Sequence, residues 1–383
     1  MGCGGEEYGR RIRNDRMLQM KITIITSPFH ELPPIAIGAV EKLFYQLAGE
    51  WVKNGNEVVF LCCGGGDDER MEIIRLKKYN RTGSTKKDLI WDFFYSIKAL
   101  WKCPKTDVLF CNTFWTPVFA PFFRWKYRRL IYGVHRYPKG QYWLYPFVHV
   151  FICVSTVVAR ALQNELGNGS RIRTVINPID DVVFNSATQR HYVNGRVLYA
   201  GRVHPAKGLL CLAQASKQLY ERGECSELML VGGHEKEKGG GGEDFVAELR
   251  DAAKPCPLKL TGSISSPCQL ADIERSAEVF VYPSEDSIGE ACPIAPMEAM
   301  ALGVPTVVGD LKCFDDYVSD KVNAIRFKTG SAVDLVQKIS YVLSDANVVQ
   351  GLGAEAAKSM GKYSARNVAI RYLDVFASVC ADA

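Results

Sequence analysis

Short apolar runs alternate with helical patterns along most of the chain, and this alternation occurs twice. A run at 21–26 is followed by a helical pattern over 38–54, by Gly55 as its stop, and by a second run at 57–62. This order is typical of a βαβ unit. Further apolar runs lie at 108–111, 130–134, 151–154 and 173–176. Such short, apolar-rich runs are expected of parallel strands that are covered on both faces.

A second series of runs begins at 196–200 and has the same architecture. Its later strands are expected at 228–231, 259–261, 279–282 and 306–308. Asn177-Pro178 and a polar stretch separate the two series, so the chain is expected to divide near 180–194. We therefore predict an α/β fold class of two doubly wound, Rossmann-like domains that face each other across a cleft, where ligands of such folds bind.

The predicted organisation has four segments. A disordered N-terminal extension covers 1–19, and the two Rossmann-like domains cover 20–185 and 190–362. The remaining residues, 363–383, are expected to form a C-terminal helix that packs back on the N-terminal domain.

Composition and spacing exclude several classes of protein. No apolar run reaches the roughly 18 residues that span a bilayer, and the first residues are charged where a signal peptide needs a hydrophobic stretch. The 13 cysteines contain no C-x-x-C pair, so neither a disulfide framework nor a zinc site has the required spacing. A cytoplasmic protein with reduced thiols is expected.

The densest group of candidate residues lies over 282–305, where a strand, a loop and a helix beginning near Pro293 are expected. Proline suits a first helical turn, and the free backbone amides beside it would point at an anion. Those amides belong to Cys292, Ile294 and Ala295. Glu290 precedes the helix and Glu298 lies about two turns along it, so one carboxylate can reach a sugar and the other a ribose. Alternatively, Glu298 is an exposed helical residue and Glu290 a charge that complements the helix dipole.

A second candidate segment follows the strand at 196–200. The strand runs into Gly201, and Arg202 and Lys207 then lie five residues apart at the start of the next helix. Arginine can hold a diphosphate as a planar fork and lysine as a point charge. The alternative is two solvated loop cations.

Together these segments resemble the paired signatures of the retaining nucleotide-sugar glycosyltransferases of family 4, also called group 1, which have the GT-B fold. The matching features are the turn with Gly201, Arg202 and Lys207, and a Glu-x7-Glu element followed by Ala-Met-Ala-x-Gly-x-Pro. Gly38 is similar to the family's glycine-rich loop, and the turn at 262–264 to its base-proximal turn.

The resemblance implies roles for individual residues. Arg202 and Lys207 would bind the donor diphosphate, Glu298 the ribose and Glu290 the hydroxyls of the transferred sugar, while His135 would face that sugar from the first domain. The implied catalytic residues are Glu290, His135, Arg202 and Lys207. The implied donor-binding residues are Gly38, Gly201, Arg202, Lys207, Ile264, Glu290, Cys292, Ile294, Ala295 and Glu298. Pro293 stands where many members have glycine.

The reaction that the resemblance implies is transfer of a sugar from a UDP- or GDP-linked donor to an acceptor hydroxyl with retention of configuration, in glycan or glycolipid (cell-envelope) biosynthesis. The first domain would then bind the acceptor and the second the donor. Because no Asp-x-Asp motif is present, we expect no metal and no cofactor besides the nucleotide-sugar substrate. Protein cations would stabilise the charge that grows on the departing diphosphate.

The acceptor side is marked by aromatic and basic residues. The helical pattern over 86–103 places apolar residues near lysines, and no carboxylate occurs between Asp107 and Glu165. The apolar residues are Ile90, Trp91, Phe94, Ile97, Leu100 and Trp101. This helix could rest on anionic lipid or face the core. Our hypothesis is peripheral binding at the cytoplasmic membrane face and a glycan or lipid-linked acceptor.

Rival interpretations remain open at this stage. A nucleotide-sugar epimerase or phosphorylase would use the same fold, and a noncatalytic sugar-nucleotide or membrane-binding module would keep it. A dinucleotide oxidoreductase is disfavoured because Ser-Pro-Phe-His, rather than G-x-G-x-x-G, follows the first strand. No nucleic-acid partner is expected, because none of the usual recognition motifs is present.

Overall fold

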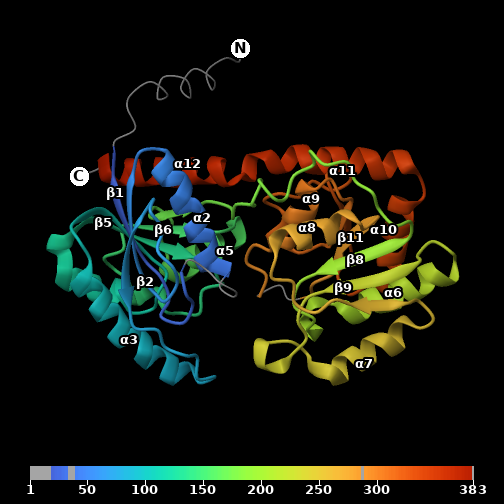
Figure 1. Cartoon of the computed structure of the whole chain (residues 1–383), viewed down its shortest axis with the longest axis horizontal. Helices are drawn as coiled ribbons and strands as arrows, with labels where there is room; N and C mark the ends of the chain where they lie inside the picture. The colour runs from blue at the N-terminus through green and yellow to red at the C-terminus, as the bar shows by residue number, and fades with distance from the viewer. Residues whose placement is uncertain (1–18, 33–38, 286–288, 382–383) are drawn as a thin grey trace, which may run out of the picture.

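Two parallel sheets, each flanked by helices, lie side by side in the computed structural model (Figure 1), which describes residues 19–32, 39–285 and 289–381. The first sheet has seven strands in the order β3-β2-β1-β4-β5-β6-β7. They are β1 (Lys21–Ile25), β2 (Glu57–Cys63), β3 (Glu72–Leu76), β4 (Thr106–Cys111), β5 (Tyr127–Val134), β6 (Val150–Cys153) and β7 (Ile172–Thr174). Strand order reverses at β1, which pairs with both β2 and β4.

The second sheet has six strands in the order β10-β9-β8-β11-β12-β13. They are β8 (Arg196–Ala200), β9 (Glu227–Val231), β10 (Leu258–Leu260), β11 (Val279–Tyr282), β12 (Thr306–Gly309) and β13 (Ile325–Phe327). Order reverses here at β8, the counterpart of β1. The predicted α/β fold with two doubly wound sheets is confirmed; β3 and β13 are edge strands that the apolar runs did not predict.

Helices connect the strands within each half. In the first half they are α2 (Ala39–Lys53), α3 (Thr85–Lys102), α4 (Thr116–Phe119) and α5 (Thr156–Leu166). In the second half they are α6 (Leu209–Glu221), α7 (Gly242–Ala253), α8 (Pro267–Arg275), α9 (Ala295–Ala301), α10 (Ala332–Leu343) and α11 (Ala346–Met360). Among the described residues, no helix is long and apolar enough to cross a bilayer.

The last helix, α12 (Ala365–Ala381), returns to the first sheet. Figure 1 shows α11 beside the second sheet and α12 continuing beside the first. Trp51 of α2 is fully buried against α12, where its Nε1 donates to the Ala369 carbonyl at 3.2 Å and its ring packs on Phe376. The C-terminal helix thus joins the two halves by completing the core of the first.

The carboxyl ends of the two sheets face each other. Thr156, which follows β6, donates its backbone N–H to Asp316 Oδ2 at 2.8 Å, and Asp316 follows β12. Asn177, beyond β7, donates from Nδ2 to the Cys292 carbonyl at 3.3 Å, and Cys292 follows β11. Residues placed after strands of either sheet are therefore brought toward the same region, as in other doubly wound folds.

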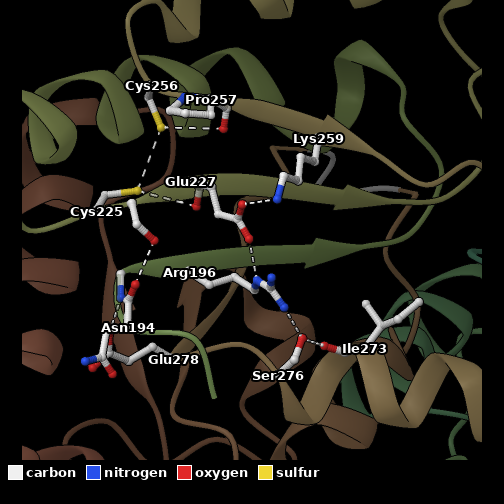
Figure 2. A network of polar contacts seen from close by, with 12 residues as sticks. Asn194, Arg196, Cys225, Glu227, Cys256, Pro257, Lys259, Ile273, Ser276 and Glu278 are labelled. Carbon is white, nitrogen blue, oxygen red and sulfur yellow. Dashed lines mark hydrogen bonds and ion pairs between the residues drawn. The ribbon is translucent and has the colours of Figure 1, made fainter. Parts of the chain in front are cut away.

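The opposite, amino-terminal edge of the second sheet is held by a polar network (Figure 2). Glu227 on β9 forms ion pairs with Arg196 on β8 at 2.6 Å and Lys259 on β10 at 2.5 Å. Burial acts to raise the pKa of Glu227, but hydrogen bonds from Lys259 and Arg196 hold it below its ordinary value. This network ties three adjacent strands together on the side remote from the candidate site.

Candidate active site

The turn after β8 positions the first candidate cation. Gly208 has φ of +65°, and a Cβ atom there would lie 2.0 Å from the Pro283 carbonyl oxygen. Only glycine allows this approach, because an L-residue is strained at this φ and its side chain would collide with backbone. The close contact places Lys207, two residues before the start of α6, against the end of β11.

Lys207 and Glu290 form a buried ion pair between Nζ and Oε1. Their side chains are 12% and 6% exposed. Tyr282, the last residue of β11, donates its hydroxyl to the same Glu290 oxygen at 3.0 Å, and its ring centroid lies 5.8 Å from Lys207 Nζ. A buried charge needs such partners, since removing it from water without them is costly. Two of the sequence-predicted catalytic residues are therefore in direct contact.

Arg202 lies apart from this pair on the exposed side of the same turn. Its Nη1 donates to the Gly239 carbonyl at 3.2 Å, and its own carbonyl accepts from the Tyr199 hydroxyl at 3.0 Å. Tyr199 stacks on Tyr282 with ring centroids 5.6 Å apart, so the Arg202 backbone is linked through two aromatic rings to the Glu290 side chain. The glycine-rich segment at 239–242, which the motifs did not assign to the site, is its neighbour.

The helix after β11 begins later than the sequence pattern predicts. Its first intrahelical hydrogen bond runs from Glu298 N to Ile294 O at 2.9 Å, and α9 starts at Ala295 rather than near Pro293. Pro296 has no N–H to donate to the Cys292 carbonyl, which Asn177 occupies, and Tyr317 donates to the Pro293 carbonyl at 3.0 Å. Pro296 stands in the first turn instead. The predicted amides of Cys292, Ile294 and Ala295 therefore precede or open a short helix.

Glu298 lies half-buried on α9 and faces charges from other elements. Its pKa is raised to about 7, because burial disfavours the ionised form and Asp180 repels it, although Lys42 of α2 acts in the opposite direction. A second carboxyl, Glu274 of α8, is fully buried close by, and both of its oxygens lack a hydrogen-bond partner within the described part of the chain. Burial and the charge of Glu298 raise the pKa of Glu274 well above its usual value.

Sequence reasoning did not single out Glu274 or Lys42. Glu274 falls three residues after the buried Ala271, so helical spacing alone would have placed it on the inner face of α8. A glutamate at an inward position is an unusual choice, since buried carboxyls are rare unless they are paired. Of the other predicted donor residues, Ile264 is half-buried beyond β10, and Gly38 lies outside the described residues.

His135 follows β5 at the carboxyl end of the first sheet. Its Nε2 atom is buried and has no hydrogen-bond partner among the described residues, and its ring contacts Phe44 edge-on at 5.0 Å. Burial lowers the pKa of His135 to about 3, and the charge of Arg136 adds to this effect. The imidazole is therefore neutral at physiological pH.

A pocket of about 520 Å³ opens beside His135 at the carboxyl end of the first sheet. Its lining includes the cations Arg81, Arg136 and Lys139 and the buried carboxyls Glu41 and Asp92. Burial raises the pKa of Asp92 to about 6, against two backbone N–H groups that donate to it. Burial likewise raises the pKa of Glu41, against the charges of Arg81 and Arg136. Across residues 19–32, 39–285 and 289–381, no cluster of His, Cys, Asp and Glu suited to a metal ion is found.

Helix α3 borders this pocket and presents apolar side chains to solvent. Ile90, Phe94 and Trp101 are 53%, 55% and 74% exposed. Its inward face is partly polar, and the buried side chains are those of Asp92, Tyr95, Ser96, Ala99 and Leu100. Of the two alternatives for this apolar stripe, burial against the core therefore holds only for Leu100 and the half-buried Ile97. The exposed lysines beside the stripe are Lys86, Lys87, Lys98 and Lys102.

The comparisons with known proteins agree with this architecture. A family model described as Glycosyltransferase Family 4 matches residues 39–182, and one described as Glycosyl transferases group 1 matches 194–345. Each of the two matches covers most of one half of the chain. The protein belongs to the family 4, or group 1, glycosyltransferases and has their GT-B fold.

Individual relatives share parts of the sequence. The chain is similar to the lipopolysaccharide 1,2-N-acetylglucosaminetransferase of Salmonella typhimurium, with 31% identity over 180 residues, or 46% of each chain. It is 30% identical over 107 residues, 28% of each chain, to the N,N'-diacetylbacillosaminyl-diphospho-undecaprenol alpha-1,3-N-acetylgalactosaminyltransferase of Campylobacter jejuni. The chain thus spans less than half of the length of these two curated relatives. Among solved structures, Anabaena HepE in complex with UDP and glucose superposes with a TM-score of 0.73 at 16% identity, covering 94% of this chain and 100% of that one.

Proposed function

We propose that the protein is a retaining glycosyltransferase that moves a sugar from a UDP- or GDP-linked donor to an acceptor hydroxyl, in the synthesis of a cell-envelope glycan or glycolipid. The observation that supports this most directly is the Lys207–Glu290 pair, buried at the carboxyl end of the second sheet with Tyr282 as its third member. A cation and a carboxylate that are paired without ligand can separate to hold a diphosphate and a sugar hydroxyl.

In this mechanism the donor diphosphate takes the place of Glu290 as the partner of Lys207. The ammonium group and the exposed Arg202 guanidinium then stabilise the negative charge that develops on the leaving diphosphate, a preorganised effect of about 3 kcal/mol per donor. Glu290, released from Lys207, accepts hydrogen bonds from the hydroxyls of the transferred sugar, and Glu298 accepts them from the ribose. Because protein cations meet the diphosphate, we propose that transfer needs neither a metal nor a cofactor.

His135 contributes from the opposite domain. Its neutral imidazole has an Nε2 atom that is not engaged by any described residue. We propose that this atom meets a hydroxyl of the donor sugar when donor and acceptor are both bound. A neutral ring suits this role, because an added positive charge would oppose the positive character that grows on the sugar.

The acceptor is proposed to carry a negatively charged group. The pocket beside His135 offers Arg81, Arg136 and Lys139 at its wall, and cations of this kind hold phosphate by charge-assisted hydrogen bonds. The names of the two relatives specify a lipopolysaccharide and a diphospho-undecaprenol. A phosphorylated, lipid-linked acceptor on this chain would have its anionic group in the pocket and its apolar part along α3.

We also propose that the protein associates peripherally with an anionic membrane at the cytoplasmic face. The exposed side of α3 alternates aromatic or aliphatic residues with lysines, which is the composition of interfacial helices. Thr85 and Leu89 of the same helix line the acceptor pocket. A membrane that contacts α3 would therefore lie next to the site where the acceptor enters.

The donor site is tested by thermal shift with UDP, GDP, ADP and their sugar conjugates. A ligand at a hundred times its dissociation constant raises the free energy of unfolding by about 2.7 kcal/mol. For a domain of this size, this corresponds to a rise of roughly 5–10 °C in melting temperature. We expect one nucleotide to stabilise the wild type and to lose this effect in Lys207→Ala and Glu298→Ala, each compared with its own ligand-free melting temperature. If none of the nucleotides raised the melting temperature, the result would contradict the transferase function. Product analysis without acceptor would reveal an epimerase or phosphorylase instead.

A further inference from the structure

A second pocket lies far from the proposed donor and acceptor sites. It occupies about 670 Å³ at the amino-terminal edge of the first sheet, where β5, β6 and β7 begin, and the end of α12 closes one side. Figure 1 shows this end of β5 and α12 on the side of the first domain that is remote from the second sheet. No part of the proposed mechanism uses this pocket.

The pocket is lined by cations without an acidic neighbour. Arg124, Arg129, Arg171 and Arg173 contribute to its wall, and none of the lining residues is acidic. None of these arginines forms an ion pair with any residue of the described ranges. An unpaired cluster of guanidinium groups around a concavity creates a positive potential that attracts anions.

Backbone carbonyls hold several of the arginines in place. Arg171 Nη1 donates to the carbonyls of Pro146 and Val148, both at 2.8 Å, and Arg129 Nε donates to that of Val379 at 2.6 Å. Arg173 Nη1 is fixed in the same way by the carbonyl of Ser170 at 2.9 Å. A guanidinium has five N–H donors, so each group keeps further donors for a ligand. The cluster is therefore ordered before any anion arrives.

The half-buried His149 also lines the pocket. His149 accepts the backbone N–H of Leu130 on Nδ1 at 3.1 Å, which fixes its ring. Burial lowers the pKa of His149, and the charges of Arg129 and Arg124 lower it further. The histidine stays neutral, so the positive charge of the pocket comes from the arginines at its wall.

Exposed aromatic side chains lie at one side of the pocket and form its aromatic rim. Phe147 lines the pocket and is 62% exposed, and Phe122 and Trp125, next to the lining residues Pro121 and Arg124, are 71% and 66% exposed. Lys126 joins this region to the end of α3 by donating to the Cys103 carbonyl at 2.9 Å. The aromatic rim therefore lies close to the C-terminal end of α3. Aromatic rings next to cations are typical of surfaces at a membrane interface.

We propose that this pocket binds the phosphate head group of an anionic phospholipid within a bilayer, while the aromatic rings of the rim enter the interfacial region. The proposal rests on the proposed membrane association and assigns it a specific lipid site. A phosphate fits the pocket because arginine forks bind phosphate oxygens in pairs, and the rim explains why the phosphate belongs to a lipid. The first domain would then contact the membrane at two places, the pocket and α3.

The test measures binding of the full-length protein to phosphatidylcholine vesicles with and without phosphatidylglycerol. Arg124→Glu/Arg173→Glu changes two exposed arginines of the pocket, and Arg222→Glu/Arg250→Glu makes the same charge change on the exposed surface of the second domain. We expect the pocket variant to bind phosphatidylglycerol vesicles at least tenfold more weakly, since each basic residue at an anionic surface contributes roughly fivefold. The control variant should bind like the wild type. Arg124→Gln/Arg173→Gln repeats the test if the charge reversal does not fold.

A second set of vesicles contains an anionic lipid without phosphate, at the same surface charge. Comparing the two sets distinguishes phosphate binding in the pocket from general electrostatic attraction to the membrane. The wild type should prefer the phospholipid, and the pocket variant should lose that preference. Equal binding of phosphatidylglycerol vesicles by the wild type and the pocket variant would overturn the lipid assignment. Failure of the wild type to bind any vesicle would overturn the membrane association as well, whereas the nucleotide thermal shift tests the donor site independently.

Discussion

Replacing Lys207 by methionine should destabilise the second domain through the carboxylate that it leaves behind. Methionine keeps an apolar stem of similar length and removes only the ammonium group. Glu290 then remains 6% exposed, with the Tyr282 hydroxyl as its remaining polar partner among the described contacts. The physical cost comes from an uncompensated charge in a site that excludes water.

The expected size follows from the burial of both partners. Removing one member of a buried ion pair costs about 3–5 kcal/mol, whereas replacing both members is often nearly neutral. For a domain of this size, 3 kcal/mol corresponds to a drop of about 6–12 °C in melting temperature. The double variant Lys207→Met/Glu290→Gln should recover most of this loss.

A double-mutant cycle measured by thermal unfolding separates the pair from its surroundings. The two single variants should each be strongly destabilised and the double variant only slightly, which gives a coupling energy of about 2 kcal/mol or more. Strictly additive effects would refute the pairing as the source of stability. Ligand binding gives an independent readout, because Glu290→Gln frees Lys207 and should keep nucleotide affinity, whereas Lys207→Met should lose it.

Further outcomes are expected from the same geometry. Nucleotide affinity measured by calorimetry should fall as pH decreases through about 7, because protonated Glu298 no longer accepts two ribose hydrogen bonds, and Glu298→Gln should flatten this dependence. The sign for stability is opposite: the raised pKa means that Glu298 favours folding at low pH, and this contribution is lost as pH rises through about 7. Gly208→Ala should lower the melting temperature more than Gly223→Ala, since both have positive φ but only the first would collide with the Pro283 carbonyl. His135→Ala should reduce the transfer rate while leaving the nucleotide thermal shift intact, and the pH profile between 5 and 8 should not contain the titration of His135, whose pKa is about 3.

The sequence predicts the sheets well where strands are buried on both faces. Uninterrupted apolar runs identify the central strands, because their burial leaves no polar alternation. The edge strand β3 has charged residues at Glu72 and Arg75, so it gives no uninterrupted apolar run. The start of α9 was mispredicted because Pro296 has no N–H for the Cys292 carbonyl, and because Asn177 and Tyr317, remote in sequence, donate to the carbonyls of Cys292 and Pro293.

The candidate site is only partly visible in the sequence. The motifs identify Lys207 and Glu290, yet their pairing across 83 positions depends on the close approach at Gly208, which a one-dimensional pattern does not contain. The environment of Glu298 depends even more on residues that are distant in the sequence. Its pKa depends on Lys42 and Asp180, which belong to the first half of the chain and the connection between the halves.

Helix α3 shows why a helical period alone cannot decide which face is buried. The period defines a stripe of apolar residues, but the inward face is selected by hydrogen bonds to the segment after β4. Asp92 accepts the backbone N–H groups of Phe114 and Trp115 at 2.9 and 3.0 Å, and Ser96 receives the Thr116 hydroxyl at 3.1 Å. Because these polar groups satisfy backbone donors that would otherwise be buried without partners, they must face inward, and the aromatic stripe is turned outward. The exposed apolar face of α3 is therefore a consequence of these hydrogen bonds, and it is the surface that the proposed membrane association would use.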